Sequence, residues 1–317
     1  MPTPSSILRL LALLLAGQAA GLAAAQRAAP AAPPARDDAA RDNAARRGAA
    51  EGDQEWVRLS KDNTGKPLGL QTAVARYEGT PPGAEGRVRV DLVGAIHVGD
   101  RAYYEDLNER FAEYDALLFE LVAPEGTVVP RGGRTRSDNP LGAAQNGMKT
   151  LLELEHQLEI VDYTRPNFVH ADMSPDEFFQ TMKDRDEGLL KLYFRMLGQG
   201  IAEQSKAAAK GESAEMDLLK SFFAQDRARQ MKIAMAGQMT QLEGLLTNFG
   251  GEKGTTIIHE RNRRAMDVLA RQIAAGKRSI GVFYGAGHLA DMDERLRERF
   301  GLRQMSKEWL TAWDLGE

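Results

Sequence analysis

Two short stretches of this 317-residue chain place a histidine three residues after a glycine. One runs from Gly94 to His97 and the other from Gly285 to His288, each between an apolar and an amphipathic stretch. A glycine where a strand ends permits a positive φ or a close backbone approach. The following histidine then lies at the carboxyl end of the strand, where α/β sheets bind ligands. The pattern indicates two imidazoles at one sheet edge, as ligands or as structural residues.

Glu120 lies within the apolar stretch Leu117–Val122, at the carboxyl end of a predicted strand. A buried carboxylate is costly unless it is paired or coordinates a cation. It either accepts hydrogen bonds from an arginine or loop amides, or joins His97 and His288 in a two-histidine, one-carboxylate metal site. Manganese, cobalt, iron and zinc all suit such ligands, and thiolate ligands are excluded because the chain has no cysteine.

A third polar group opens a predicted helix at His259-Glu260-Arg261-Asn262. Glu260 could act as a general base, Arg261 could hold a carbonyl or carboxylate, and Asn262 could donate to an oxyanion. The alternative for Glu260 is a surface ion pair with Arg264, four residues later. His259 is a further candidate ligand.

The two remaining histidines are less informative. His156 is predicted to be exposed on a helix, between Glu155 and Gln157. His170 precedes a predicted helix start at Ser174-Pro175, and it either lines the same crevice or lies outside it.

The elements around the first turn read as strands and one helix. Strands are predicted over 68–77 and 87–96, and an amphipathic helix over 101–114 begins behind the candidate N-cap Asp100. A short buried strand over 116–122 follows. Strand, helix and strand in succession predict a βαβ unit with a parallel pair and a right-handed crossover.

The second turn repeats this arrangement. A strand over 278–284, a helix over 289–300 and one or two final strands over 302–315 surround it. The segments GAIHVGDRAYYEDLNERF and GAGHLADMDERLRERF both continue into an acidic helix that ends on Glu-Arg-Phe. We interpret them as an internal duplication of one strand–turn–helix unit.

Between the two units, residues 141–275 are predicted to form a mainly helical insertion, with a helix start at Asn139-Pro140. The expected fold class is α/β, a mixed, mostly parallel sheet flanked by helices. Methionines recur through the insertion, either as core filler or as an adaptable binding surface. They are Met182, Met196, Met216, Met231, Met235 and Met239.

The amino-terminal residues predict export. Residues 1–25 hold an apolar run and a small-residue cleavage pattern, which indicates a secretory signal peptide or, alternatively, an uncleaved anchor. Residues 26–54 form a disordered Ala/Pro-rich linker, and residues 55–317 the α/β domain. The expected location is periplasmic or secreted, with no transmembrane segment after cleavage. The formal net charge of -4 and short, mixed basic clusters argue against a nucleic-acid partner.

Together, GAIHVGD, FELV, HERNRRAMD and YGAGHLADMDERL resemble the TraB/PrgY/GumN family over about residues 88–122 and 255–300. That family is grouped with the Tiki metalloproteases and, more distantly, with erythromycin-esterase-like and ChaN-like haem-binding proteins. The resemblance implies a mixed sheet flanked by helices and, for the Tiki branch, a divalent-metal-dependent peptidase. It makes His97 and His288 the motif histidines, Glu120 the motif glutamate, and Arg261-Asn262 the motif pair.

We therefore expect an exported, metal-dependent hydrolase that acts on a peptide or a small molecule. In this hypothesis His97, Glu120 and His288 hold the metal, while Glu260, Arg261 and Asn262 assist the chemistry. Two alternatives remain open. The same crevice could bind a peptide or haem without turnover, or it could support an esterase-like reaction with a histidine base and no metal.

Overall fold

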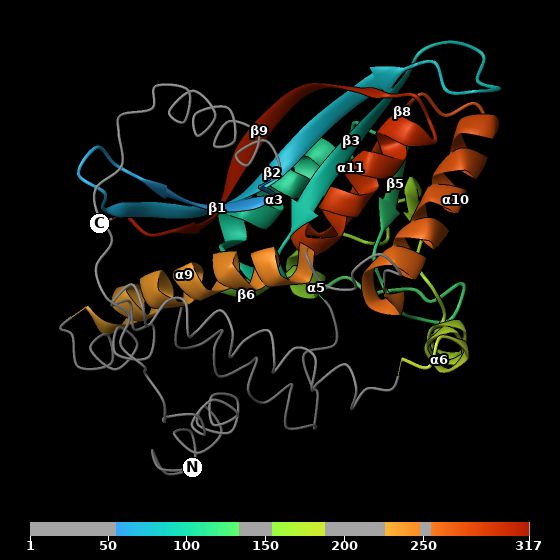
Figure 1. Cartoon of the computed structure of the whole chain (residues 1–317). Helices are drawn as coiled ribbons and strands as arrows, with labels where there is room; N and C mark the ends of the chain where they lie inside the picture. Colours follow the sequence, from blue (N-terminus) through green and yellow to red (C-terminus); the bar gives the residue numbers. More distant parts are fainter. Residues whose placement is uncertain (1–54, 133–153, 188–225, 248–254, 317) are drawn as a thin grey trace, which may run out of the picture. The chain divides into compact units, whose positions relative to one another are not determined.

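A computed structural model of the chain describes residues 55–132, 154–187, 226–247 and 255–316, which belong to one compact unit (Figure 1). The predicted signal peptide, the linker, the helix start at Asn139-Pro140 and the methionines Met196 and Met216 lie outside the described residues. The sequence predictions can therefore be compared with the structure mainly for the strands, the two Gly-x-x-His units and parts of the insertion.

A mixed sheet of 7 strands forms the centre of this unit, in the order β1-β2-β3-β8-β5-β7, with β9 also paired to β2. Its strands are β1 (Val57–Lys61), β2 (Pro67–Gly79), β3 (Val88–Ala95), β5 (Ala116–Phe119), β7 (Phe168–His170), β8 (Ser279–Gly285) and β9 (Arg303–Asp314). The pairings β3–β8, β8–β5 and β5–β7 are parallel, and β2 is antiparallel to each of its three neighbours. All strands except β2 consequently run in one direction, and the expected α/β fold is confirmed.

The predicted βαβ unit differs from the structure in one respect. β3 and β5 are parallel and are joined by helix α3 (Arg101–Phe111), but they are not neighbours, because β8 lies between them and pairs with both. β8, the strand of the second Gly-x-x-His unit, thus lies between β3 and β5, the two strands of the first unit. β3, β5 and β8 are buried almost throughout, as expected for parallel strands covered on both faces.

The helices that position the site follow the strands. Figure 1 shows α10 (Arg261–Ala274) and α11 (Leu289–Glu298) side by side beside the sheet. Each has a clearly amphipathic sequence and buries its apolar face, and α10 also buries Arg261 and Asn262 in its first turn. In α3 the predicted face of Tyr104, Leu107 and Phe111 is buried. These helices explain how the sheet is covered near the two turns.

Other local predictions have mixed outcomes. Ser174 begins α6 (Pro175–Asp184) with a capping box to Glu177, as the Ser-Pro pair indicated. Asp100 occupies the N-cap of α3 but makes no side-chain cap hydrogen bond; its carboxylate instead accepts from Lys232 and from the Asp314 N–H. The helix predicted around His156 is wrong at that residue, which lies in the short strand β6 (Glu155–His156).

β6 pairs with β4 (Val98–Gly99) in a small second sheet, and helix α5 (Gln157–Ile160) follows it. The longest described helix of the insertion is α9 (Arg227–Thr247). Met182 and Met231 are buried, and Met235 and Met239 are partly buried against the core, which favours core filler at these positions. Within the described parts of the chain, no helix combines the length and apolar character needed to cross a membrane.

Candidate functional site

Four parallel strands, β3, β8, β5 and β7, end at the same edge of the sheet, and each is followed closely by a residue capable of chemistry. These residues are His97, His288, Glu120 and Asp172. The carboxyl ends of parallel strands are the usual ligand-binding edge of an α/β sheet. Sequence reasoning identified the first three and missed Asp172, because the short strand β7 before it was not predicted.

Glu120 is held by two hydrogen bonds. The backbone N–H of Gly285 donates to Oε2 at 2.7 Å, and Arg261 Nη2 donates to Oε1 at 2.6 Å. A Cβ at Gly285 would lie 3.2 Å from Oε2, so the glycine gives the carboxylate room to approach. Burial opposes ionisation, but the nearby His288, Arg261 and Gly285 N–H outweigh it and lower the pKa of Glu120 to about 2. Glu120 is therefore a carboxylate at neutral pH.

Arg261 joins Glu120 to Asp172. Its Nε donates to Asp172 Oδ1 at 2.9 Å and its Nη2 to Oδ2 at 2.5 Å, a bidentate pair that fixes the guanidinium plane. The Asp172 side chain is fully buried, and it also accepts from the backbone N–H of Met173. The three buried groups thus comprise two carboxylates and one guanidinium.

His288 is the most constrained histidine. Asn262 Nδ2 donates to the His288 carbonyl at 2.9 Å and to Asp291 at 2.7 Å, so Asn262 Oδ1 accepts the proton of His288 Nδ1 at 2.6 Å. This hydrogen bond fixes the tautomer and leaves a lone pair on Nε2, 3.6 Å from Glu120 Oε1. Burial, reinforced by the charge of Arg261, lowers the pKa of His288 to about 4 although Glu120 opposes the shift, so the ring is neutral at pH 7.

His97 is placed differently. Its side chain is exposed, while its backbone carbonyl accepts from the N–H of Gln157 at 3.0 Å. The ring is close enough for its charge to help lower the pKa of Glu120. The structure therefore brings Glu120, His288 and Arg261 into contact, with His97 nearby at the surface.

The remaining candidates fall into two groups. Arg261 and Asn262 belong to the centre, whereas the Glu260 carboxylate accepts from Arg185 at 3.0 Å and from Arg263 at 2.9 Å. Its surface partner is thus Arg263, not Arg264 as the spacing suggested.

Neither of the other two histidine candidates bonds to Glu120 or Arg261 in the described part of the chain. His259 Nδ1 accepts from the Thr255 N–H, and its Nε2 lies 4.0 Å from Asp291. His170 Nε2 is 2.6 Å from the Leu121 carbonyl. Each of these two rings therefore has a hydrogen bond with the backbone instead of with the residues at the centre.

A π-helical turn, η3 (Thr256–Glu260), delivers Arg261 and Asn262 to the centre. The Thr255 hydroxyl caps it by accepting from the Ile258 N–H, and α10 continues directly from it. Single π-helical turns are rare and are frequent at functional sites. The first turn of α10 therefore presents both side chains to the strand ends.

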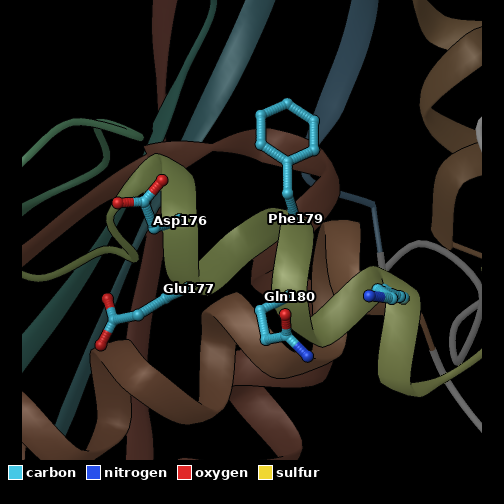
Figure 2. A pocket seen from close by; sticks show the side chains of 5 residues that line it. Asp176, Glu177, Phe179 and Gln180 are labelled. Atoms are coloured by element: carbon cyan, nitrogen blue, oxygen red, sulfur yellow. The ribbon is translucent and has the colours of Figure 1, made fainter.

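An open depression elsewhere is lined by one helix only. Figure 2 shows the α6 side chains Asp176, Glu177, Phe179, Gln180 and Lys183, with Phe179 projecting away from the helix and 58% exposed. None of the candidate site residues lines it. The candidate site therefore remains at the carboxyl ends of the strands, away from this depression.

Comparison of the chain with protein-family models, characterised proteins and solved structures finds no match. Among the described residues, no group of three or more His, Asp or Glu side chains is arranged so that it could hold a metal ion. The function must consequently be inferred from the charges and contacts around Glu120, Arg261 and His288.

Proposed function

We propose that this protein is an exported, divalent-metal-dependent hydrolase that acts on peptide bonds, with its centre at Glu120, His288 and His97. The observation that supports it most is an excess of negative charge among buried side chains. Glu120 and Asp172 are both paired to the single cation Arg261, and the neutral His288 ring adds an electron pair instead of a charge. A buried cluster with one excess negative charge favours a bound cation.

The donor atoms fit such an ion. His288 Nε2 and Glu120 Oε1 are 3.6 Å apart, and two ligands of one tetrahedral ion, each about 2.1 Å from it, lie roughly 3.4 Å apart. A neutral imidazole nitrogen and a carboxylate oxygen suit manganese, cobalt, iron or zinc. His97 would supply the third ligand after its exposed ring turns toward Glu120.

A bound divalent cation would supply an activated water and polarise the scissile carbonyl. The chain's own groups have separable tasks. Asn262 holds His288 in the tautomer that directs Nε2 inward, and Asp172 holds the guanidinium of Arg261. Within the described part of the chain, Arg261 Nη1 makes only long contacts, at 3.5 Å, with His288 and the Ile257 carbonyl, so it could donate to a substrate oxygen.

The test measures metal content and cleavage in the full chain. Elemental analysis of the purified protein should find a divalent metal that is lost from His288→Ala and reduced in His97→Ala. His156→Ala, in β6, is the matched control and should keep the metal. Incubation with a mixed peptide library, followed by mass spectrometry, should show products that disappear when a chelator is added. Cleavage that survives both the chelator and His288→Ala would disprove the proposal.

A second candidate is a binding protein that holds a peptide or haem at the same edge without turnover. One observation favours it: in the described residues, every carboxylate near the centre is already paired. Glu120 and Asp172 bind Arg261, and Glu260 binds Arg185 and Arg263, so none is free to accept a proton. Retention of a peptide or of haem at one equivalent, without product, would support this function over hydrolysis.

A further inference from the structure

Each of the two motif histidines has a hydrogen bond with a residue whose side chain is a carboxamide. For His288 the carboxamide is Asn262, whose Oδ1 accepts the Nδ1 proton. For His97 it is Gln157, whose backbone N–H donates to the His97 carbonyl at 3.0 Å. The Gln157 side chain is 7% exposed although glutamine is usually a surface residue. Its burial beside a candidate ligand therefore needs an explanation.

Half of the Gln157 carboxamide is satisfied. Nε2 donates to the hydroxyl of Tyr163 at 2.7 Å, but Oε1 is buried and has no hydrogen-bond partner among the residues that the structure describes. A buried acceptor without a donor costs about 1–3 kcal/mol, and such groups are few in native proteins. Tyr163 itself packs on Phe119, the residue before Glu120. Gln157 thus contacts the first turn through its backbone and, through Tyr163, the strand that leads to Glu120.

The β4–β6 ladder ends next to residues 97 and 157. Val98 pairs with His156 and Gly99 with Glu155 in this antiparallel ladder. Beyond it His97 forms a bend and Gln157 begins α5, and the hydrogen bond from the Gln157 N–H to the His97 carbonyl joins the two backbones. The two residues are therefore neighbours through their backbones, with His97 exposed and Gln157 buried.

We propose that Gln157 is a positioning residue for His97. When the His97 ring turns inward, Gln157 Oε1 accepts the N–H of one ring nitrogen and directs the other nitrogen toward Glu120. This inference rests on the proposed metal-dependent function, because it gives the inward position of His97 a purpose. It assigns to Gln157 the task that Asn262 performs for His288. Both carboxamides then select a tautomer, which is how neighbours of metal-binding histidines act in general.

The experiment uses the full chain and Zn²⁺ alone as the probe. Gln157→Leu removes the acceptor, Gln157→Glu keeps one, and Tyr163→Phe removes the partner of Nε2 but leaves Oε1 in place. Zn²⁺ affinity is measured by competition with a chromophoric chelator. We expect a loss of roughly 10- to 100-fold for Gln157→Leu, and affinities close to that of the unaltered chain for the other two variants.

A second readout does not depend on affinity. Nitrogen-15 spectra of histidine-labelled protein report the tautomer of His97 with Zn²⁺ bound, assigned with His97→Asn. One tautomer should dominate in the unaltered chain and in Gln157→Glu, and both should be populated in Gln157→Leu. Chemical denaturation without metal establishes that each variant folds.

The outcomes separate the two proposals. If His97→Asn weakens Zn²⁺ binding while Gln157→Leu changes neither affinity nor tautomer, the role of Gln157 is disproved and the metal site remains. That result would mean that a buried water satisfies Oε1. If the unaltered chain binds no divalent metal, both proposals are disproved.

Discussion

The two Gly-x-x-His turns start from similar sequences and lie next to each other, yet they place their histidines in different surroundings. Ala95 and Gly285 are partners in the β3–β8 ladder. The second turn is a 3-10 helix, η4 (Ala286–His288), and its histidine is buried against Asn262. The first leads into β4, and its histidine is exposed. The repeated sequence thus gives a repeated strand and a repeated helix, whereas the turns between them differ in backbone course and in the burial of the histidine.

The largest expected effect comes from removing Arg261, the buried cation beside the second turn. Arg261→Met leaves Glu120 and Asp172 buried without a positive partner, and it should lower the free energy of unfolding by about 3–5 kcal/mol. Urea denaturation measures the loss. The control Arg263→Met changes a side chain that is 57% exposed and should stay within about 0.5 kcal/mol of the unaltered chain. Equal losses in the two variants would contradict the buried charge cluster.

The second prediction concerns pH in the metal-free protein. The pKa of His288 falls from 6.5 to about 4 on folding, so between these values the unfolded chain binds more protons. The free energy of unfolding should therefore decrease as the pH falls from 6.5 to 4, by about 3 kcal/mol. Glu120, whose pKa falls from 4.5 to about 2, adds stability above pH 4.5 that is lost as the pH falls toward 2. Denaturation at several pH values with a chelator present gives this profile.

Variants of the two histidines compare the turns directly. His288→Asn should flatten the profile between pH 6.5 and 4, while His97→Asn should retain it, because it leaves His288 and its burial in place. If both variants retained the same slope, the acid sensitivity would arise elsewhere in the chain.

Replacement of the motif glycines Gly94 and Gly285 by alanine should have similar effects on stability but different effects on Zn²⁺ binding. A Cβ at Gly94 would lie 3.1 Å from the Ala73 carbonyl, and one at Gly285 would lie 3.2 Å from Glu120 Oε2. Each alanine variant should lose about 1–3 kcal/mol of unfolding free energy through overpacking. Only Gly285→Ala should also weaken Zn²⁺ binding, since only that Cβ meets the carboxylate. Gly237→Ala, in α9, where a Cβ would meet no other described part of the chain within 4 Å, is the control and should stabilise by roughly 0.5–1 kcal/mol.

The smallest expected effect concerns the ion pair between Lys232 and Asp100, at the start of α3. Lys232 Nζ donates to Asp100 Oδ1 at 2.7 Å and ties α9 to the first unit. Lys232→Met should lower the free energy of unfolding by about 0.5–1 kcal/mol without changing Zn²⁺ affinity. Lys183→Met, at an exposed position of α6, should have no measurable effect. A change in Zn²⁺ affinity for Lys232→Met would show that α9 influences the centre.

Sequence reasoning recovered the parts of the fold that depend on local pattern. Apolar alternation predicted β2, β3 and β8, and helical spacing predicted α3 and α11. It failed where a distant segment decides the outcome. Nothing near β3 or β5 indicates that β8 separates them, and the pairing of His156 with Val98 outweighs the helical pattern around it.

The site shows the same division. His288, Glu120, Arg261 and Asn262 could be singled out because their types are unusual next to apolar strands. Asp172, the partner of Arg261, could not, because it follows a very short strand that has no periodicity of its own. The exposed ring of His97 was also not predictable, since exposure depends on what packs outside the turn.

The position of β8 has a consequence for how the chain folds. Its residues Ser279–Gly285 are the common neighbour of β3 and β5, and the following strand β9 pairs along β2. A growing polypeptide therefore leaves the ribosome with the middle of its sheet missing until residues 279–285 have been made. The early strands would meanwhile expose unpaired edges that invite aggregation. Such a topology favours late, concerted folding, and it makes a deletion within β8 more damaging than a deletion of equal length in a loop.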